Sequence, residues 1–351
     1  MKYSFIIPVY NRPEETAELL ESLAHQHIKD FEVIVVEDGS ARPSDKVCDR
    51  YKELGNLQLT YLVKENGGPG KARNYGVEKA QGEYVIILDS DVVLPDSYLQ
   101  AVDDELRREP CDAFGGPDRA DSSFTPTQKA ISYSMTSFFT TGGIRGGKKK
   151  LDKFYPRSFN MGIRRSIYLQ LGGFADMRFG EDIDFSIRIF KAGCSCRLFP
   201  GAWVYHKRRT DFRKFWRQVF NSGIARINLY KKYPESLKLV HLLPMLFTVG
   251  VALLMLGFLA GIALFFLLPS GMQQATGIAV SLLCLLPILL YAGIIFFDAN
   301  IQCNSAKIGL LAIRAAFTQL IGYGCGFLTA WWRRCVKGQD EFSAYKKNFY
   351  K

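Results

Sequence analysis

The sequence predicts an α/β fold with a mainly parallel sheet, followed by helices that cross or line a membrane. Two observations lead to this prediction. Apolar runs alternate with helical patterns through the first 230 residues or so, and no Asp, Glu, Lys or Arg occurs between Leu239 and Phe297. Apolar strands alternating with helices are typical of parallel sheets covered on both faces. An uncharged stretch of this length can cross a bilayer, which takes about 20 residues.

Four apolar runs in the first part of the chain predict buried strands. They are Phe5–Val9, Phe31–Val36, Leu57–Val63 and Tyr84–Leu88. Ligands of parallel sheets bind beyond the carboxyl ends of the strands. Two of these strands end in acids, Asp38 in one case and Asp89 with Asp91 in the other, which makes this edge the expected site.

Helices are expected between and after these strands. The first begins near Pro13, where a proline suits the first helical turn, and apolar residues then recur at helical spacing. The others cover Gly70–Ala80, Pro95–Arg108, Glu181–Ala192 and the basic, amphipathic Phe212–Tyr233. One more strand is expected at Arg197–Tyr205. Residues 119–155 are expected to be less regular, with a glycine- and lysine-rich loop that is either mobile near the site or the membrane, or simply a solvated surface loop.

The C-terminal part of the chain predicts a membrane domain. Two spans are expected, at about 239–268 and 275–297, and their basic flanks favour the cytoplasmic side. The stretch of about 306–332 is apolar but contains Lys307 and Arg314, and a charge in mid-membrane is costly. An interfacial amphipathic helix is therefore favoured there, and a third span stays open. The expected division is 1–233 for the first domain, 234–335 for the membrane domain and 336–351 for a basic cytoplasmic tail.

Charge and cysteine content limit the other classes of protein. The net charge is +11, with much of the excess between Gly201 and Lys238. Such a stretch could bind nucleic acid, but because it leads directly into an apolar span, a collar that faces anionic lipid is favoured and no nucleic-acid partner is expected. The eight cysteines include no CxxC pair, which argues against a structural zinc site. The N-terminus does not resemble a signal peptide, so the first domain is expected to stay on the side where it is made.

The strongest chemical motif is Asp89-Ser90-Asp91, which directly follows a buried strand. Two carboxylates this close together in a turn can hold Mg²⁺ or Mn²⁺ against a diphosphate. The cation would stabilise the charge that develops on a departing nucleoside diphosphate. Most such pairs in proteins are solvated turn residues, and it is the position after the strand that favours the metal.

Three other features could contribute to the same chemistry. Glu181-Asp182 opens a predicted helix, where acids often act only as caps, but a carboxylate there could also be a general base. A glycine-rich segment, 66–74, runs from a strand into a helix and suits phosphate. His206, beside Arg208 and Arg209, is either a packing residue or a ligand of a metal or diphosphate.

Five segments of the chain together resemble a known family. FIIPVYNRPE, VVEDGS, ENGGPGKARNYG, ILDSDV and GEDIDFSIRIFKAG occur in the order seen in glycosyltransferase family 2, whose members have the GT-A fold. The resemblance covers about residues 2–230, and it is specific because all five motifs occur in order. The C-terminal part more loosely resembles bacterial members that act on lipid-linked or surface glycans.

This resemblance implies roles for individual residues. Asp182 would be the catalytic base, Asp89 and Asp91 would bind the metal, and His206 is a further candidate for the metal or the diphosphate. The residues implied at the nucleotide sugar are Pro8, Tyr10, Asp38, Gly68, Lys71, Arg73, Asp89 and Ser90. Glu181, Arg208 and Arg209 are expected nearby.

The function implied is an inverting, metal-dependent transfer of a sugar from a nucleotide sugar, with UDP as the commonest carrier in the family. The expected acceptor is a lipid-linked or surface glycan, and the expected location is the bacterial cytoplasmic membrane with the catalytic domain in the cytoplasm. The chain lacks the QxxRW motif of processive synthases, so transfer of a single sugar is expected. Two alternatives stay open, a polyprenyl-phosphate glycosyltransferase and a non-enzymatic scaffold that binds a nucleotide sugar at the membrane.

Overall fold

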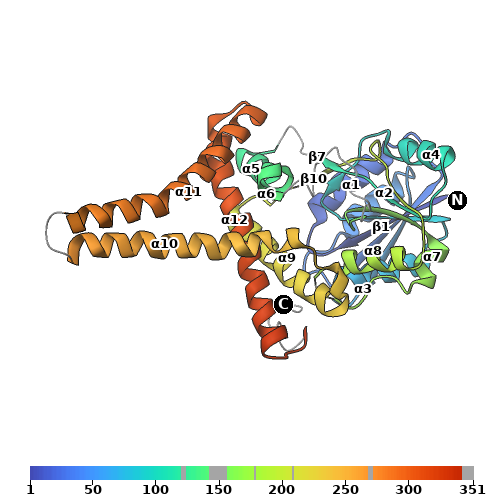
Figure 1. Ribbon diagram of the computed structural model, residues 1–351. Coiled ribbons are helices and arrows are strands. Elements are labelled where there is room, and N and C mark those ends of the chain that lie inside the picture. Colours follow the sequence, from blue (N-terminus) through green and yellow to red (C-terminus); the bar gives the residue numbers. More distant parts are fainter. Residues whose placement is uncertain (120–123, 142–155, 178, 208, 268–271, 342–351) are drawn as a thin grey trace. The chain divides into compact units, whose positions relative to one another are not determined.

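The computed structural model describes residues 1–119, 124–141, 156–177, 179–207, 209–267 and 272–341. These residues form two compact units (Figure 1). The first contains the described residues up to 119 and those from 156 to 207, and the second contains 124–141 and 209–341. The boundaries expected at residues 233 and 335 stay predictions, although the basic helix that follows residue 211 packs within the second unit.

A seven-stranded sheet forms the centre of the first unit. Its strand order is β3-β2-β1-β4-β8-β6-β9. The strands are β1 (Tyr3–Val9), β2 (Phe31–Asp38), β3 (Gln58–Lys64), β4 (Tyr84–Leu88), β6 (Ala113–Gly115), β8 (Asn160–Arg164) and β9 (Cys196–Leu198). All neighbours are parallel except β8, which is antiparallel to β4 and β6. The expected mainly parallel α/β sheet is confirmed.

Helices cover both faces of this sheet. Successive side chains of a strand point to opposite faces, and so Ile7 of β1 belongs to one apolar core and Ile6 to the other. The core around Ile7 includes residues of α1 (Pro13–Ala24), α2 (Asp45–Glu53) and α4 (Tyr98–Arg108). The core around Ile6 includes residues of α3 (Pro69–Lys79), α7 (Arg165–Gln170) and α8 (Glu181–Lys191). Both faces of β1 are therefore buried, which is why its sequence is a continuous apolar run.

The prediction of one continuous strand at Arg197–Tyr205 is wrong. The structure has two strands there, β9 and β10 (Val204–His206), in different sheets. Pro200 and Gly201 form a turn between them, closed by a hydrogen bond of 3.1 Å from the Ala202 N–H to the Phe199 carbonyl. In the second, three-stranded sheet, β10 lies between β5 (Val92–Val93) and β7 (Asp118–Arg119). The sequence analysis also missed α2, α7 and the strands β5 to β8, which are short or polar.

The second unit is helical in its described part. It contains α5 (Pro126–Thr136), α6 (Phe138–Thr141), α9 (Phe212–Lys232), α10 (Leu243–Leu267), α11 (Met272–Cys303) and α12 (Ala306–Trp331), with short turns η1 (Pro234–Ser236), η2 (Leu239–His241) and η3 (Trp332–Val336). The expectation of irregular structure is wrong for α5, which starts with a capping box between Thr125 and Gln128. The glycine- and lysine-rich loop expected at 142–150 lies outside the described residues.

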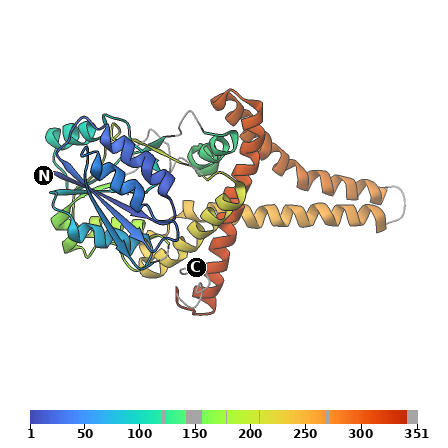
Figure 2. The same ribbon diagram turned by 180° about the vertical axis from the view of Figure 1, so that it is seen from behind.

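Three helices of the second unit are long and apolar enough to cross a membrane: α10, α11 and α12 continued through η3. They differ in how much protein covers them. Only 6% of the most apolar stretch is buried in α10 and in α11, against 44% in α12. Figures 1 and 2 show α10 and α11 side by side as a hairpin, with α12 crossing at its base.

Candidate functional site

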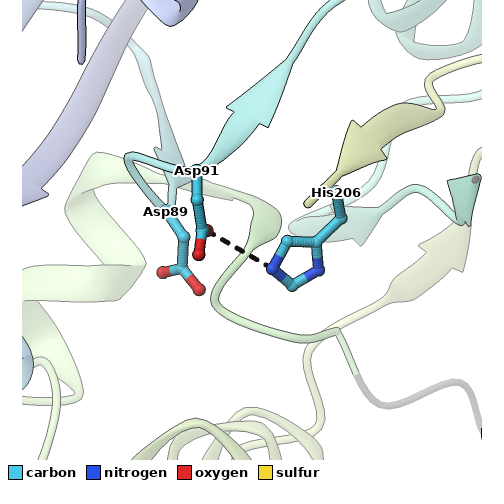
Figure 3. A group of neighbouring side chains, drawn as sticks. All are labelled: Asp89, Asp91 and His206. Atoms are coloured by element: carbon cyan, nitrogen blue, oxygen red, sulfur yellow. Dashed lines mark ion pairs between the residues drawn. The ribbon is translucent and has the colours of Figure 1, made fainter. Parts of the chain in front are cut away.

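The turn after β4 carries Asp89 and Asp91, and a second strand pair brings His206 to it. Strand β5 begins at Val92, directly after Asp91, and pairs antiparallel with β10, where His206 lies opposite Val92. The Lys207 N–H also donates to the Asp91 carbonyl at 3.0 Å. Residues far apart in the sequence are therefore held together by backbone pairing, and Figure 3 shows the three side chains facing one another.

These three side chains form a site that fits a divalent cation. One carboxylate oxygen from each of Asp89 and Asp91 and one ring nitrogen of His206 lie within 4.8 Å of one another. The Asp91 Oδ1 is 3.4 Å from the His206 Nε2, and the imidazole stacks on Phe159 with ring centroids 4.9 Å apart. Two carboxylates suit Mg²⁺ or Mn²⁺, and the imidazole nitrogen makes the set a better match for Mn²⁺, because Mg²⁺ prefers oxygen ligands.

An arginine that the sequence analysis did not single out contacts this site. The Arg12 guanidinium, from the loop between β1 and α1, forms an ion pair with the Asp91 carboxylate. Burial raises the pKa of Asp91, but the contacts with His206 and Arg12 outweigh burial and hold this pKa below its usual range. Asp91 is therefore ionised at neutral pH, and a cation that binds it competes with Arg12.

Arg73 links the metal-ligand candidates to the start of α8. Its side chain is only 4% exposed, with Nη2 2.7 Å from Asp89 and Nη1 3.0 Å from Glu181. The guanidinium also lies 5.1 Å from the ring centre of Phe174. Burial raises the pKa of Glu181, and the neighbouring Asp182 raises it further, while Arg73 opposes both. The expected contact of Arg73 with nucleotide stays a prediction, and two of its nitrogens are already engaged by carboxylates.

Asp182 lies in the first turn of α8, next to Glu181. The helix begins after Gly180, whose φ of 84° is a left-handed conformation that favours glycine. One Asp182 oxygen accepts a hydrogen bond of 2.8 Å from the Ile183 N–H, and the other is 2.8 Å from the Arg157 Nε. Helix dipoles favour acids at this position. The sequence analysis missed Arg157, because it follows no motif and only the tertiary structure brings it to α8.

The glycine-rich segment is held by Asp38, at the end of β2. The Asp38 carboxylate accepts backbone hydrogen bonds from Gly67 at 2.8 Å and Gly68 at 2.7 Å, and a third bond of 2.6 Å from the Lys64 ammonium. Gly68 has a φ of 87°, which a side chain would strain. Asp38 therefore shapes the loop between β3 and α3, and its expected contact with the nucleotide sugar stays a prediction.

The remaining residues expected at the nucleotide lie at or near this edge of the sheet. Pro8 and Ser90 are buried. Tyr10 is 44% exposed at the end of β1, and the exposed Lys71 pairs with Asp176 at 3.0 Å. Their roles stay predictions.

Two expected site residues do not belong to this group. Arg208 lies outside the described residues. Arg209 is half-buried and belongs to the second unit.

Comparisons with known proteins agree with the fold and the motifs. Residues 4–172 match the family model described as glycosyl transferase family 2. The poly(ribitol-phosphate) beta-N-acetylglucosaminyltransferase TarS of Staphylococcus aureus is 42% identical over 93 residues, which are 26% of this chain and 16% of TarS. The glycosyltransferase GlyG of Streptococcus pneumoniae is 30% identical over 125 residues, which are 34% of this chain and 42% of GlyG. These matched segments are thus less than half of either relative.

A solved structure extends the fold comparison to nearly the whole chain. The mannosyltransferase PcManGT of Pyrobaculum calidifontis, solved with GDP-Man and Mn²⁺, superposes with a TM-score of 0.57. The match covers 95% of this chain and 88% of PcManGT at 18% sequence identity. At that identity the likeness concerns the fold.

Proposed function

We propose that this chain, whose residues 4–172 match the glycosyl transferase family 2 model, is an inverting, metal-dependent glycosyltransferase. The observation that carries the proposal is that an arginine connects the two acidic motifs, one with Asp89 and Asp91 and the other with Glu181 and Asp182. Asp89 and Asp91 face His206, and Arg73 joins Asp89 to Glu181, the neighbour of Asp182. A cation site and a candidate base thus lie on one continuous network.

The residues that would hold the cation are Asp89, Asp91 and His206. When bound there, Mn²⁺ or Mg²⁺ would neutralise the charge of a nucleoside diphosphate leaving group. Arg12 already lies against Asp91. Once it is displaced from Asp91, its guanidinium is well suited to bind a phosphate oxygen of the donor, because arginine matches phosphate geometry.

Asp182 would act as the base. Its carboxylate would accept the proton of an acceptor hydroxyl as that oxygen attacks the anomeric carbon from the face opposite the diphosphate, which inverts the configuration. Arg157 pairs with Asp182 and so orients the carboxylate. It would have to move for the acceptor hydroxyl to approach that oxygen.

The proposed donor is UDP-linked, and the proposed acceptor is a lipid-linked or surface glycan at the bacterial cytoplasmic membrane. The name of TarS describes beta-linked transfer of N-acetylglucosamine to poly(ribitol-phosphate), which supports UDP-GlcNAc as the first donor to test. The apolar helices α10 and α11 support an acceptor held at a membrane. They equally support a polyprenyl phosphate as the acceptor, which is the second candidate.

The test is release of nucleoside diphosphate by the detergent-purified chain. The donors would include UDP-GlcNAc, GDP-mannose and dTDP-sugars, each with Mn²⁺ or with EDTA. Release from one donor that EDTA abolishes and Mn²⁺ restores is the expected result. Because a strict need for acceptor could suppress release, donor binding is measured in parallel. Failure to bind any donor with Mn²⁺ present would contradict the proposal, and binding without transfer to any lipid or glycan acceptor would favour the scaffold alternative.

A further inference from the structure

The helix α12 differs from α10 and α11 in its neighbours, although all three are long and apolar enough to cross a membrane. It packs along the basic helix α9. At one end the Arg314 guanidinium lies 4.4 Å from the ring centre of Phe212. At the other, Arg334 of η3, which continues α12, donates a hydrogen bond to Asn228. The two helices therefore run in the same direction, side by side over most of α9.

Their contact is close because glycines meet backbone on both sides. A Cβ added at Gly223 of α9 would lie 2.2 Å from the Tyr323 carbonyl oxygen, and one added at Gly326 of α12 would lie 2.0 Å from the Phe220 carbonyl oxygen. Neither glycine could carry a side chain without moving the helices apart. Wherever α12 lies relative to a bilayer, α9 must lie beside it.

Because α9 packs against α12, the charges on α9 argue against α12 as a third membrane span. The exposed cations on α9 are Arg213, Lys214, Arg217, Lys231 and Lys232. If α12 crossed the bilayer, α9 would carry several of these cations into hydrocarbon, which is costly for each one near the bilayer centre. Lys307 and Arg314 of α12 are exposed as well. Because they are seven residues apart, they lie on the same helix face, as in a helix that lies along a surface.

Helix α12 contacts the α10–α11 hairpin near the start of α10 and in the second half of α11, which we call the base of the hairpin. Thr248, in the second turn of α10, donates to the Leu320 carbonyl at 3.3 Å, and the ring of Phe317 lies 5.7 Å from that of Tyr291, in the second half of α11. Farther from this base, α10 and α11 pack on each other, where Gly261 meets Ser281 and Gly277 meets Phe265. Figures 1 and 2 both show the hairpin projecting away from α12.

We propose that α10 and α11 are the two membrane spans and that α9 and α12 lie along the bilayer surface at the base of this hairpin, against anionic lipid headgroups. The 25 residues of α10 have a length of about 37 Å at 1.5 Å per residue, enough for a hydrocarbon core of about 30 Å. The exposed tryptophans Trp216, Trp331 and Trp332 suit the interface, where this residue type is enriched. The cations of α9 would attract anionic lipid headgroups.

This placement has two consequences. The described residues after α12 would lie on the same side of the membrane as residue 209, which lies just before α9 in the second unit. The hairpin is an anchor and not a conduit, because α10 and α11 are in direct contact at Gly257 and Cys284 as well as at the two glycines above. A sugar transferred by this chain would stay on that side until a separate membrane-crossing step moved the product.

The native cysteines provide the test. Cys303 lies at the end of α11 and Cys335 in η3, so they flank α12, and Cys284 lies within α11. Three single-cysteine chains, each keeping one of these residues with the other seven changed to serine, would be labelled with a membrane-impermeant maleimide in inside-out and in right-side-out vesicles that contain anionic lipid. A fourth chain, with Leu54→Cys and no native cysteine, marks the side of the first unit, because Leu54 is exposed there.

The expected result is that Cys303, Cys335 and the cysteine at position 54 label in the same vesicle orientation and lose labelling in the other. Cys284 should label only after detergent is added. Labelling of Cys303 and Cys335 from opposite faces would show that α12 crosses the membrane and would overturn the proposal. Labelling of Cys284 in intact vesicles would show that the hairpin is not inserted and would overturn it too. This placement is independent of the proposed transferase activity, so loss of activity in these variants does not affect the outcome.

Discussion

The sheet of the first unit and the hairpin of the second are both built from continuous apolar runs, but they are covered differently. Every residue of β1, Tyr3–Val9, is buried by protein on both faces. Only 6% of the most apolar stretch of α10 is buried, and Leu253, Leu256 and Leu259 are more than half exposed. The same side-chain chemistry therefore forms a protein core in one unit and an uncovered apolar surface, which we propose faces lipid, in the other.

The difference follows from length and from backbone hydrogen bonding. A strand of 7 residues cannot cross a bilayer, and its N–H and C=O groups need neighbouring strands. A helix of 25 residues satisfies its own backbone and can remain apolar on all sides. The acids and arginines of the candidate site all lie in the first unit. The comparison thus separates a unit proposed for chemistry from a unit proposed for membrane attachment.

The largest expected effect is on the rate of sugar transfer, and it should leave membrane attachment unchanged. Asp182→Asn should lower the transfer rate about 10²–10⁴-fold, the range for loss of a general base, while donor binding and the membrane-bound fraction stay unchanged. Rates measured with saturating donor, alongside donor titration and membrane fractionation, test this. If transfer persists at close to the original rate, the base assignment is wrong and an acceptor that needs little deprotonation, such as a polyprenyl phosphate, is favoured.

The next effect concerns the buried charges of the first unit. Arg73→Met removes the cation between Asp89 and Glu181. Leaving the buried Glu181 carboxylate unpaired, together with the partly exposed Asp89, should lower the free energy of unfolding by about 3–5 kcal/mol. Thermal unfolding of the detergent-purified chain measures the change. The control is Arg42→Gln, which breaks an exposed pair with Glu14 and should cost less than about 1 kcal/mol. Equal effects of the two variants would contradict the structural role of Arg73.

A matched pair of truncations compares the two apolar surfaces directly. Ile7→Ala removes a fully buried side chain in the sheet and should cost about 2–5 kcal/mol. Leu256→Ala, at a position on α10 that is 63% exposed, should cost less than about 1 kcal/mol in lipid, because lipid tails are as apolar as leucine and leave no cavity. Both are measured by thermal unfolding after reconstitution in vesicles. A large cost for Leu256→Ala would indicate that another protein surface covers α10.

The smallest expected effect is at Asp91. Arg12→Gln removes the cation paired with this carboxylate, so Mn²⁺ should bind about two- to fivefold more tightly without nucleotide, which corresponds to a partly exposed ion pair worth up to about 1 kcal/mol. Titration followed by the electron paramagnetic resonance of free Mn²⁺ gives the affinity directly, and Arg42→Gln again serves as the control. Unchanged or weaker Mn²⁺ binding in Arg12→Gln would show that Arg12 does not compete with the cation.

The sequence alone predicted the elements that have a clear period. The apolar runs that became β1, β2, β3 and β4 are each long enough to be seen, and so are α10 and α11. It could not predict the two-residue strands β5 and β7, because elements this short have no period to detect. It also merged β9 with β10 by reading through the turn at Pro200 and Gly201, since the flanking residues are apolar on both sides.

The residues of the candidate site also fall into two groups, those that local sequence patterns predicted and those that only the tertiary structure brings to the site. Asp89, Asp91 and Asp182 were predicted from local patterns, because each directly follows or opens a regular element. Arg157 carries no local signal, and Arg12 and His206 carry little. Their positions depend on the β5–β10 pairing, the loop after β1 and the approach to α8. Sequence by itself determined the elements with long apolar runs or a clear helical period, and which acids stand at their ends. The tertiary structure decided which cation neutralises each acid, since an ion pair depends on distance in space and not on separation along the chain.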